Sequence, residues 1–321
     1  MAQAESVTVV EVGPRDGLQY ESGFFSTQGK IKLIDLLSQT GLTRIEATSF
    51  VHPKAVPQLA DAAQVMSGIT KRPGVAYSVL VPNLKGCQAA LASPADELAL
   101  FVSASETHNR KNVNQSVAES LAGLAEVARL GRAAGRRLRG YIVTAFGCPY
   151  EGRIPRERLA AILDAYAGMG VAEVSLGDTT GMANPRLAGE LAAWLLAGGW
   201  PLDIAFHFHD SRGLGLANVT AAHRAGIRVF DASVGGVGGC PTASGASGNV
   251  DTLDLVNLFE EMGVATGVDF ERLRAAAAFL AAELGAQLPS RTLGRGRPQW
   301  GGPGRPAGGL NPAPDPPLDQ V

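Results

Sequence analysis

An alternation between short apolar segments and longer helical segments, repeated eight times, constrains the fold most strongly. Helical patterns such as 28–40, 117–134 and 156–169 lie between segments rich in Val, Ile and Leu. This alternation is typical of βαβ units and a parallel sheet. Eight units within about 260 residues predict a (β/α)8 TIM barrel, with an open doubly wound sheet as the structural alternative. The candidate strands are 7–12, 44–48, 75–80, 98–102, 138–144, 172–176, 204–209 and 229–233.

Two further segments follow the eighth unit. Residues 269–286 form an Ala-rich amphipathic pattern, which predicts an added C-terminal helix. Residues 289–321 hold 8 Pro and 7 Gly in 33 residues. Such a segment buries too little apolar surface to offset the entropy lost on ordering, so we expect a disordered tail. The predicted organisation is a barrel domain with its helical extension at 1–288 and a tail at 289–321.

Charge and cysteine content limit the class of protein. The net charge is -2 and the sequence has no dense basic run, so we expect no nucleic-acid partner. The start of the chain has no signal-peptide pattern, and no apolar run is long enough to span a bilayer. Three cysteines, an odd number without framework spacing, favour a reducing compartment. We therefore expect a cytoplasmic protein without a membrane partner.

Polar residues lie at the ends of two of the candidate strands, at the end of a barrel where catalytic groups gather. Arg15 and Asp16 follow the first strand between Pro14 and Gly17; a surface turn with a local ion pair is the alternative interpretation. His207 and His209 belong to the seventh strand. Their spacing of two places both rings on one face, where they could hold a divalent metal or simply pack at the strand end.

A glycine-rich segment after the eighth strand contains Cys240. Residues 235–249 read GGVGGCPTASGASGN, which favours a mobile loop that presents a thiol and closes over a substrate; a flexible linker with an incidental cysteine is the alternative. Cys87 begins a helical pattern, so we interpret it as structural. Cys148 follows the fifth strand and receives no role.

Two acidic residues lie where an isolated carboxylate would be costly. Glu46 belongs to the second strand, and Asp178 follows the sixth. A buried carboxylate must be paired or functional. Either residue could serve in catalysis or form a structural ion pair with Arg15.

Two long motifs resemble those of one enzyme family. Residues 10–19, VEVGPRDGLQ, resemble the opening signature of 3-hydroxy-3-methylglutaryl-CoA lyases. Residues 238–241, GGCP, followed by GASGN at 245–249, are similar to the cysteine loop of that family. Shorter similarities lie at 48–51, 82–86, 148–152 and 175–179, and the resemblance covers about residues 7–285. The family belongs to the broader DRE-TIM metallolyase group.

The resemblance implies a separate role for each of these residues. A divalent cation, Mg²⁺ or Mn²⁺, would be held by Asp16, His207, His209 and Asn249. Arg15 would stabilise the thioester enolate and Cys240 would transfer a proton, while Glu46 and Asp178 would orient or tune the site. His207 or Asp16 would act as the base that takes the substrate's hydroxyl proton. The expected substrate is an acyl-CoA, cleaved to acetyl-CoA and a keto acid such as acetoacetate. A homodimer is expected from the family alone.

The sequence also departs from the family pattern near the expected pocket. The differences fall at Tyr20, Ser22, His108, Thr242 and Ser211-Arg212. They leave open a differently branched 3-hydroxy-3-substituted acyl-CoA as the substrate. Two alternative functions also remain at this point: a condensing acyltransferase of the same superfamily, and a non-catalytic acyl-CoA-binding barrel.

Overall fold

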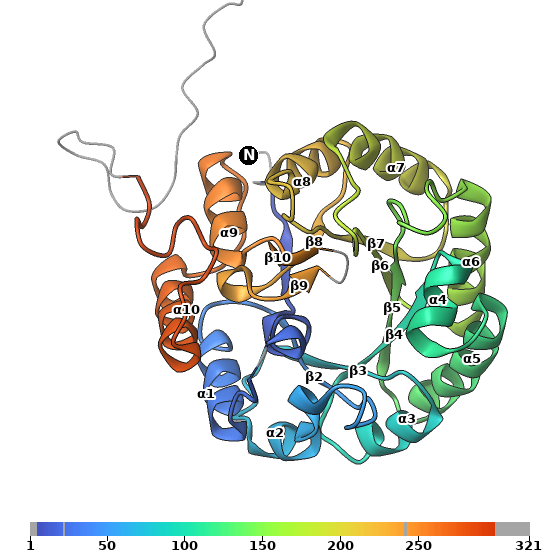
Figure 1. Cartoon of the computed structure of the whole chain (residues 1–321), viewed down its shortest axis with the longest axis horizontal. Helices are drawn as coiled ribbons and strands as arrows, with labels where there is room; N and C mark the ends of the chain where they lie inside the picture. Colours follow the sequence, from blue (N-terminus) through green and yellow to red (C-terminus); the bar gives the residue numbers. More distant parts are fainter. Residues whose placement is uncertain (1–4, 22, 241–242, 299–321) are drawn as a thin grey trace, which may run out of the picture.

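Eight parallel strands close into a barrel that is surrounded by helices (Figure 1). The computed structural model describes residues 5–21, 23–240 and 243–298. Neighbouring strands pair in chain order, and β1 pairs with β8 to close the ring. The barrel is therefore confirmed, and the open sheet is wrong. The strands are β1 Thr8–Glu11, β2 Arg44–Ser49, β3 Ala76–Leu80, β4 Glu97–Ser103, β5 Arg137–Val143, β6 Glu173–Gly177, β7 Asp203–His207 and β8 Val229–Ala232.

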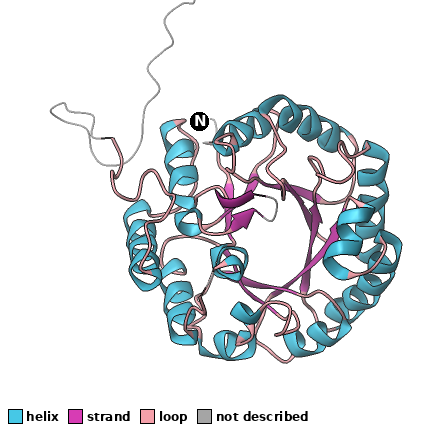
Figure 2. Cartoon of the chain, viewed as in Figure 1, coloured by secondary structure: helices cyan, strands magenta, loops and turns pink. Residues whose placement is uncertain are grey.

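The helices form the outer layer, as Figure 2 shows. Their boundaries follow local sequence signals: α5 begins with a capping box formed by Ser116 and Glu119, and α6 ends at Gly170 in the left-handed conformation. Every helix in the described part of the chain is too short or too polar to cross a lipid bilayer. The helices that follow the strands are α1 Thr27–Leu37, α2 Ala62–Gly68, α3 Leu84–Leu91, α4 Glu106–Val113, α5 Val117–Ala133, α6 Arg156–Met169, α7 Pro185–Ala197, α8 Gly215–Arg224 and α9 Thr252–Glu261.

The predicted additional helix is present as α10, Phe270–Leu284, and packs against α1 and α9. The residues that follow α10 remain in contact with the barrel. The backbone N–H groups of Arg291 and Thr292 donate to the Asp254 carboxylate on α9 at 2.9–3.1 Å. The Arg291 guanidinium also contacts Asp210, which follows β7, at 2.9 Å. Residues 289–298 thus contact the barrel through polar groups, and Leu293 packs against the core. The predicted disorder of the tail stays a prediction, and residues 299–321 lie outside the described residues.

Ion pairs cross the interior of the barrel, where branched apolar side chains usually fill the layers. Arg44 on β2 contacts Glu173 on β6 at 2.7 Å and Glu97 on β4 at 3.2 Å. Arg139 on β5 contacts Glu173 at 2.7 Å and Asp231 on β8 at 2.6 Å. Buried charges are costly unless each one is paired, so these contacts fix the interior beneath the carboxyl ends of the strands.

Candidate active site

Asp16, His207 and His209 come together at the carboxyl ends of β1 and β7. Asp16 lies in the short helical turn Gly13–Gly17 directly after β1, and His207 is the last residue of β7. One ligand atom of each residue lies within 4.8 Å of the others. The two imidazole rings lie on the same side of the strand, with centroids 5.2 Å apart. The three residues therefore form a candidate metal site.

Asn249 joins this cluster beside His209. Its backbone forms an isolated bridge with His209, and its side chain hydrogen-bonds to Asp16. The Asn249 Nδ2 donates to the Val237 carbonyl at 3.1 Å. A β-carbon at Gly238, whose φ is 129°, would lie 2.5 Å from that Nδ2. Glycine at position 238 thus lets the backbone pass close to the Asn249 side chain.

The residues present fit a divalent cation. The Asn249 Oδ1 and the His209 Nδ1 are buried and have no hydrogen-bond partner among the described residues, which is uncommon for buried polar atoms. Burial, assisted by the nearby His207, lowers the pKa of His209 to about 3. A neutral imidazole is the form that coordinates a metal. One carboxylate, one amide and two imidazoles supply the oxygen and nitrogen donors that such cations use.

Arg15 lies beside the cluster and is held by two carboxylates. Its Nε and Nη2 contact Glu46 Oε2, each at 2.6 Å, and its Nη1 contacts Asp16 at 2.5 Å. Burial opposes a charge on this guanidinium, but Glu46 and Asp16 raise the pKa of Arg15 above its usual value. The Gln19 amide also donates to Asp16 at 2.9 Å. Arg15 is thus a fixed positive charge at the floor of the site.

Of the two acids that could pair with Arg15, Glu46 does so and Asp178 does not. The Asp178 Oδ1 accepts a hydrogen bond from the Ala183 N–H at 2.9 Å, while its Oδ2 is buried without a described partner. Burial raises the pKa of Asp178 to about 7. Asp178 therefore holds the loop that follows β6 and does not pair with Arg15.

Cys240 lies in a hairpin rather than in an irregular loop. Strand β9, Gly239–Cys240, pairs antiparallel with β10, Ala243–Ser247. The Cys240 side chain and residues 241–242 lie outside what the structure describes, so the thiol's role in proton transfer stays a prediction. Figure 1 shows the hairpin near β8 at the barrel opening. Cys87 and Cys148 are both fully buried.

A cavity of about 430 Å³ opens over the cluster. Arg15, Asp16, His207 and His209 form one part of its wall. Two of the departures from the family pattern, Tyr20 and His108, also line it. The remaining wall is largely apolar and is formed by residues that include Val51, Val56, Leu80, Pro82, Phe101 and Val143.

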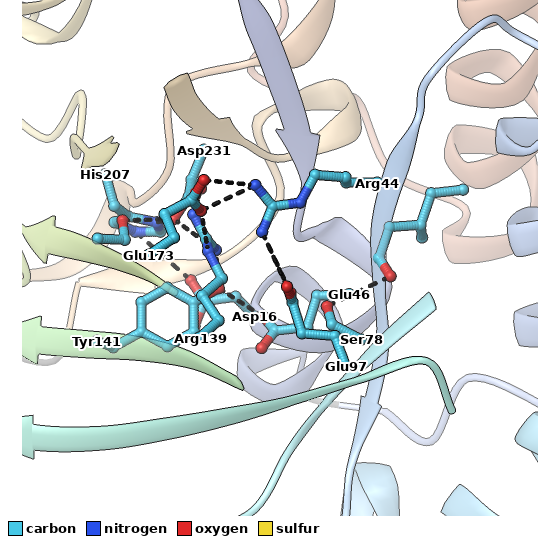
Figure 3. Close-up of polar contacts among 12 residues, drawn as sticks. Asp16, Arg44, Glu46, Ser78, Glu97, Arg139, Tyr141, Glu173, His207 and Asp231 are labelled. Carbon is cyan, nitrogen blue, oxygen red and sulfur yellow. Dashed lines mark hydrogen bonds and ion pairs between the residues drawn. The ribbon is translucent and has the colours of Figure 1, made fainter. Parts of the chain in front are cut away.

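Several side chains that support the site were missed by sequence reasoning. Figure 3 shows Asp231 beside His207, and Tyr141 beside Arg139. The Tyr141 hydroxyl accepts from Arg139 at 2.6 Å and donates to Glu46 at 3.3 Å. The available signal was a charged residue inside an apolar strand, the argument applied to Glu46; it applies equally to Arg139 and Asp231.

Glu11 was also missed, although it joins three segments around the site. Its carboxylate accepts from the backbone N–H groups of Gly13 at 2.7 Å and Val234 at 2.9 Å. It also accepts from the Thr252 hydroxyl at 2.7 Å. This fully buried side chain ties the turn that bears Asp16 to the segments on either side of the β9–β10 hairpin.

Comparison with known proteins places the chain in a family. The family model "HMGL-like" matches residues 6–280. The hydroxymethylglutaryl-CoA lyase YngG of Bacillus subtilis is 48% identical over 91% of this chain and 98% of its own length. The mitochondrial hydroxymethylglutaryl-CoA lyase of Gallus gallus is 48% identical over 89% of this chain and 96% of its own.

A solved structure gives the same result. An HMG-CoA lyase from Acinetobacter baumannii, in complex with coenzyme A and 3-methylmalate, superposes with a TM-score of 0.89. It is 43% identical and covers 95% of this chain and all of its own. The resemblance predicted from the two long motifs is thus confirmed. The chain belongs to the HMGL-like family, together with the hydroxymethylglutaryl-CoA lyases.

Proposed function

We propose that this chain cleaves 3-hydroxy-3-methylglutaryl-CoA to acetyl-CoA and acetoacetate with the help of Mg²⁺ or Mn²⁺. The observation that carries the proposal is the convergence of Asp16, His207 and His209 beside the buried Arg15, in a chain of this family. Asn249 would be the fourth protein ligand. A bound divalent cation acts there as a Lewis acid, polarising oxygen atoms that it coordinates.

The protein's own groups account for the remaining chemistry. The bond between C2 and C3 of the substrate would break after the C3 hydroxyl loses its proton. Of the two acceptors considered, His207 and Asp16, we assign this step to Asp16, because a His207 that binds the cation has no free lone pair. The electron pair of that bond moves onto the thioester as an enolate. Arg15 would stabilise the enolate oxygen, because a preorganised charge in a buried site is worth several kcal/mol to such a species. Protonation of C2, assigned here to the Cys240 thiol, gives acetyl-CoA.

The positions of Glu46 and Asp178 suggest separate supporting roles. Glu46 holds the Arg15 guanidinium in one orientation through two contacts at 2.6 Å. Asp178 fixes the loop after β6 through its hydrogen bond to Ala183. Neither role requires contact with the substrate.

The direct test is incubation of the purified full-length chain with 3-hydroxy-3-methylglutaryl-CoA and Mg²⁺ or Mn²⁺. Acetyl-CoA and acetoacetate should form in equal amounts, and a chelator should stop the reaction. The variant His209→Ala should reduce metal binding and lyase activity together. Absence of both products with either metal would refute the proposed function.

Substrate preference and assembly need their own measurements. Because Tyr20 and His108 line the cavity, a panel of acyl-CoA substrates with longer branches at C3 should be compared with the methyl compound. We also propose a homodimer in the cytoplasm. Light scattering on the purified protein would test the dimer, and a monomer at all concentrations would contradict it.

A further inference from the structure

Asp231 on β8 is the register partner of His207 on the neighbouring strand β7. Its side chain is completely buried, and its Oδ2 lies 3.5 Å from the His207 Nδ1 (Figure 3). The Ser175 hydroxyl donates to the same Oδ2 at 2.8 Å, and the Arg139 Nη2 donates to Oδ1 at 2.6 Å. The carboxylate is therefore held from two sides, and its Oδ2 faces one ring nitrogen of His207.

The partner of Asp231 is itself immobilised. Arg139 is fully buried, and its Nε donates to Glu173 at 2.7 Å while its Nη1 donates to the Tyr141 hydroxyl at 2.6 Å. A guanidinium with this many fixed contacts cannot follow a moving carboxylate, because each lost contact would leave a buried polar group without a partner. Asp231 is thus a rigid acceptor.

The position of Asp231 determines how the two nitrogens of His207 can be used. A neutral imidazole has one N–H and one lone pair. The Nδ1 faces the Asp231 carboxylate, and the Nε2 faces Asp16 at 3.8 Å. Each ring nitrogen thus faces a carboxylate, which only accepts hydrogen bonds. Asp231 is the nearer of the two and favours a proton on Nδ1, whereas a cation held by Asp16 would take the lone pair of Nε2.

We propose that Asp231 is a positioning residue that fixes the tautomer and the direction of His207 and thereby strengthens the cation site. The separation of 3.5 Å is longer than an ordinary hydrogen bond. Such contacts in a site without its ligand often shorten when the ligand binds. A carboxylate behind a metal-binding histidine orients the ring and makes it a stronger donor.

His209 provides an internal contrast. Neither its Nδ1 nor the Nδ1 of His207 has a hydrogen-bond partner among the described residues, but the His207 Nδ1 lies 3.5 Å from the Asp231 carboxylate. The two histidines of the cluster therefore differ, because only His207 has a fixed carboxylate next to its Nδ1. Asp231 would therefore contribute to the metal affinity although it does not line the cavity.

The inference rests on the proposed metal site but is tested without substrate. The probe is Mn²⁺, added to the full-length metal-free protein, and its dissociation constant is measured by calorimetry. In the same metal-free protein, ¹⁵N NMR of the imidazole rings reports which nitrogen of His207 bears the proton. A failure of lyase activity would not affect either result, so the two proposals can fail separately.

Asp231→Asn is the decisive variant, and Glu173→Gln is its matched control. Both remove one carboxylate charge from the buried Arg139, but only Asp231 contacts His207. Asp231→Asn should weaken Mn²⁺ binding about 10- to 100-fold and shift the His207 proton from Nδ1 toward Nε2. Glu173→Gln should leave both the affinity and the tautomer unchanged.

Two results would overturn the inference. One is wild-type affinity and an unchanged His207 tautomer in Asp231→Asn. The other is an equal loss of affinity in both variants, which would assign the effect to Arg139 and the interior network. If Asp231→Asn does not fold, Ser175→Ala decides instead: it loosens the same Oδ2 without a change of charge. It should then weaken Mn²⁺ binding and disturb the tautomer, and wild-type values would reject the proposal.

Discussion

Replacement of Gly238 by alanine should damage the cation site through Asn249. The new methyl group would lie 2.5 Å from the Asn249 Nδ2, well inside van der Waals contact. The Asn249 side chain is buried, and its hydrogen bond to Val237 at 3.1 Å would have to break for it to move. That loss costs about 1 kcal/mol, and a residue other than glycine at a φ of 129° adds roughly 1–3 kcal/mol.

The expected destabilisation of Gly238→Ala is therefore about 2–4 kcal/mol. If Asn249 is a ligand, the displaced side chain should also weaken Mn²⁺ binding by about tenfold or more. Urea denaturation measures the first effect, and calorimetric titration of the metal-free protein measures the second.

Gly263→Ala is the control for backbone strain. Gly263 has a φ of 76°, and a β-carbon there would meet no atom within 4 Å. This variant should lose stability through strain but keep the affinity for Mn²⁺. Equal Mn²⁺ affinity in the two glycine variants and the wild type would refute the assignment of Asn249 to the cation site.

Three further predictions follow from individual side chains. Cys240→Ala should keep its fold and its Mn²⁺ affinity but turn over far more slowly; full activity would rule out a chemical role for the thiol. Burial raises the pKa of Glu11 from 4.5 to about 7, so its contribution to stability is present below pH 4.5 and is lost as the pH rises through about 7. Between about pH 5 and pH 8 the wild type should therefore lose about 3 kcal/mol more free energy of unfolding than Glu11→Gln, as measured by urea denaturation. An equal or larger loss in Glu11→Gln would contradict this account. Arg291→Ala should cost less than about 1 kcal/mol, because the side chain is 61% exposed, whereas Asp254→Ala, which removes an acceptor of two backbone N–H groups, should cost more and should speed proteolysis after residue 288.

The barrel could be predicted because its signal is repeated and local. All eight candidate strands overlap the observed ones, and the helical pattern at 156–169 coincides with α6. Each strand is bounded by helices with their own start and stop signals, so errors at one boundary do not spread to the next. The predicted added helix is likewise present as α10.

Other parts of the structure depend on contacts that a single sequence does not contain. Helix α9 is an exception: it was not predicted, although Asp251 is a clear N-cap signal at its start. Residues Arg291 and Thr292 contact Asp254, which lies 37 residues before Arg291. A Pro- and Gly-rich composition gives no indication of such a partner.

In the candidate site, too, some residues could be predicted from the sequence and others could not. The polar residues Arg15, Asp16, His207 and His209 of the cavity wall were predicted from strand ends and from the family motifs, whereas its apolar wall was not. The residues beneath them were not, because they act through pairing across the barrel: Arg139 and Asp231 lie 92 positions apart, yet their side chains are 2.6 Å apart. A charge inside an apolar strand predicts that a partner exists but does not identify it.

Anomalous X-ray diffraction from a crystal of the full-length protein soaked in Mn²⁺ would test the cation site most directly. We predict a single strong peak per chain, within coordination distance of Asp16, His207, His209 and the Asn249 side chain. A peak elsewhere, or none at saturating Mn²⁺, would contradict the claim that these side chains form a cation site beside Arg15.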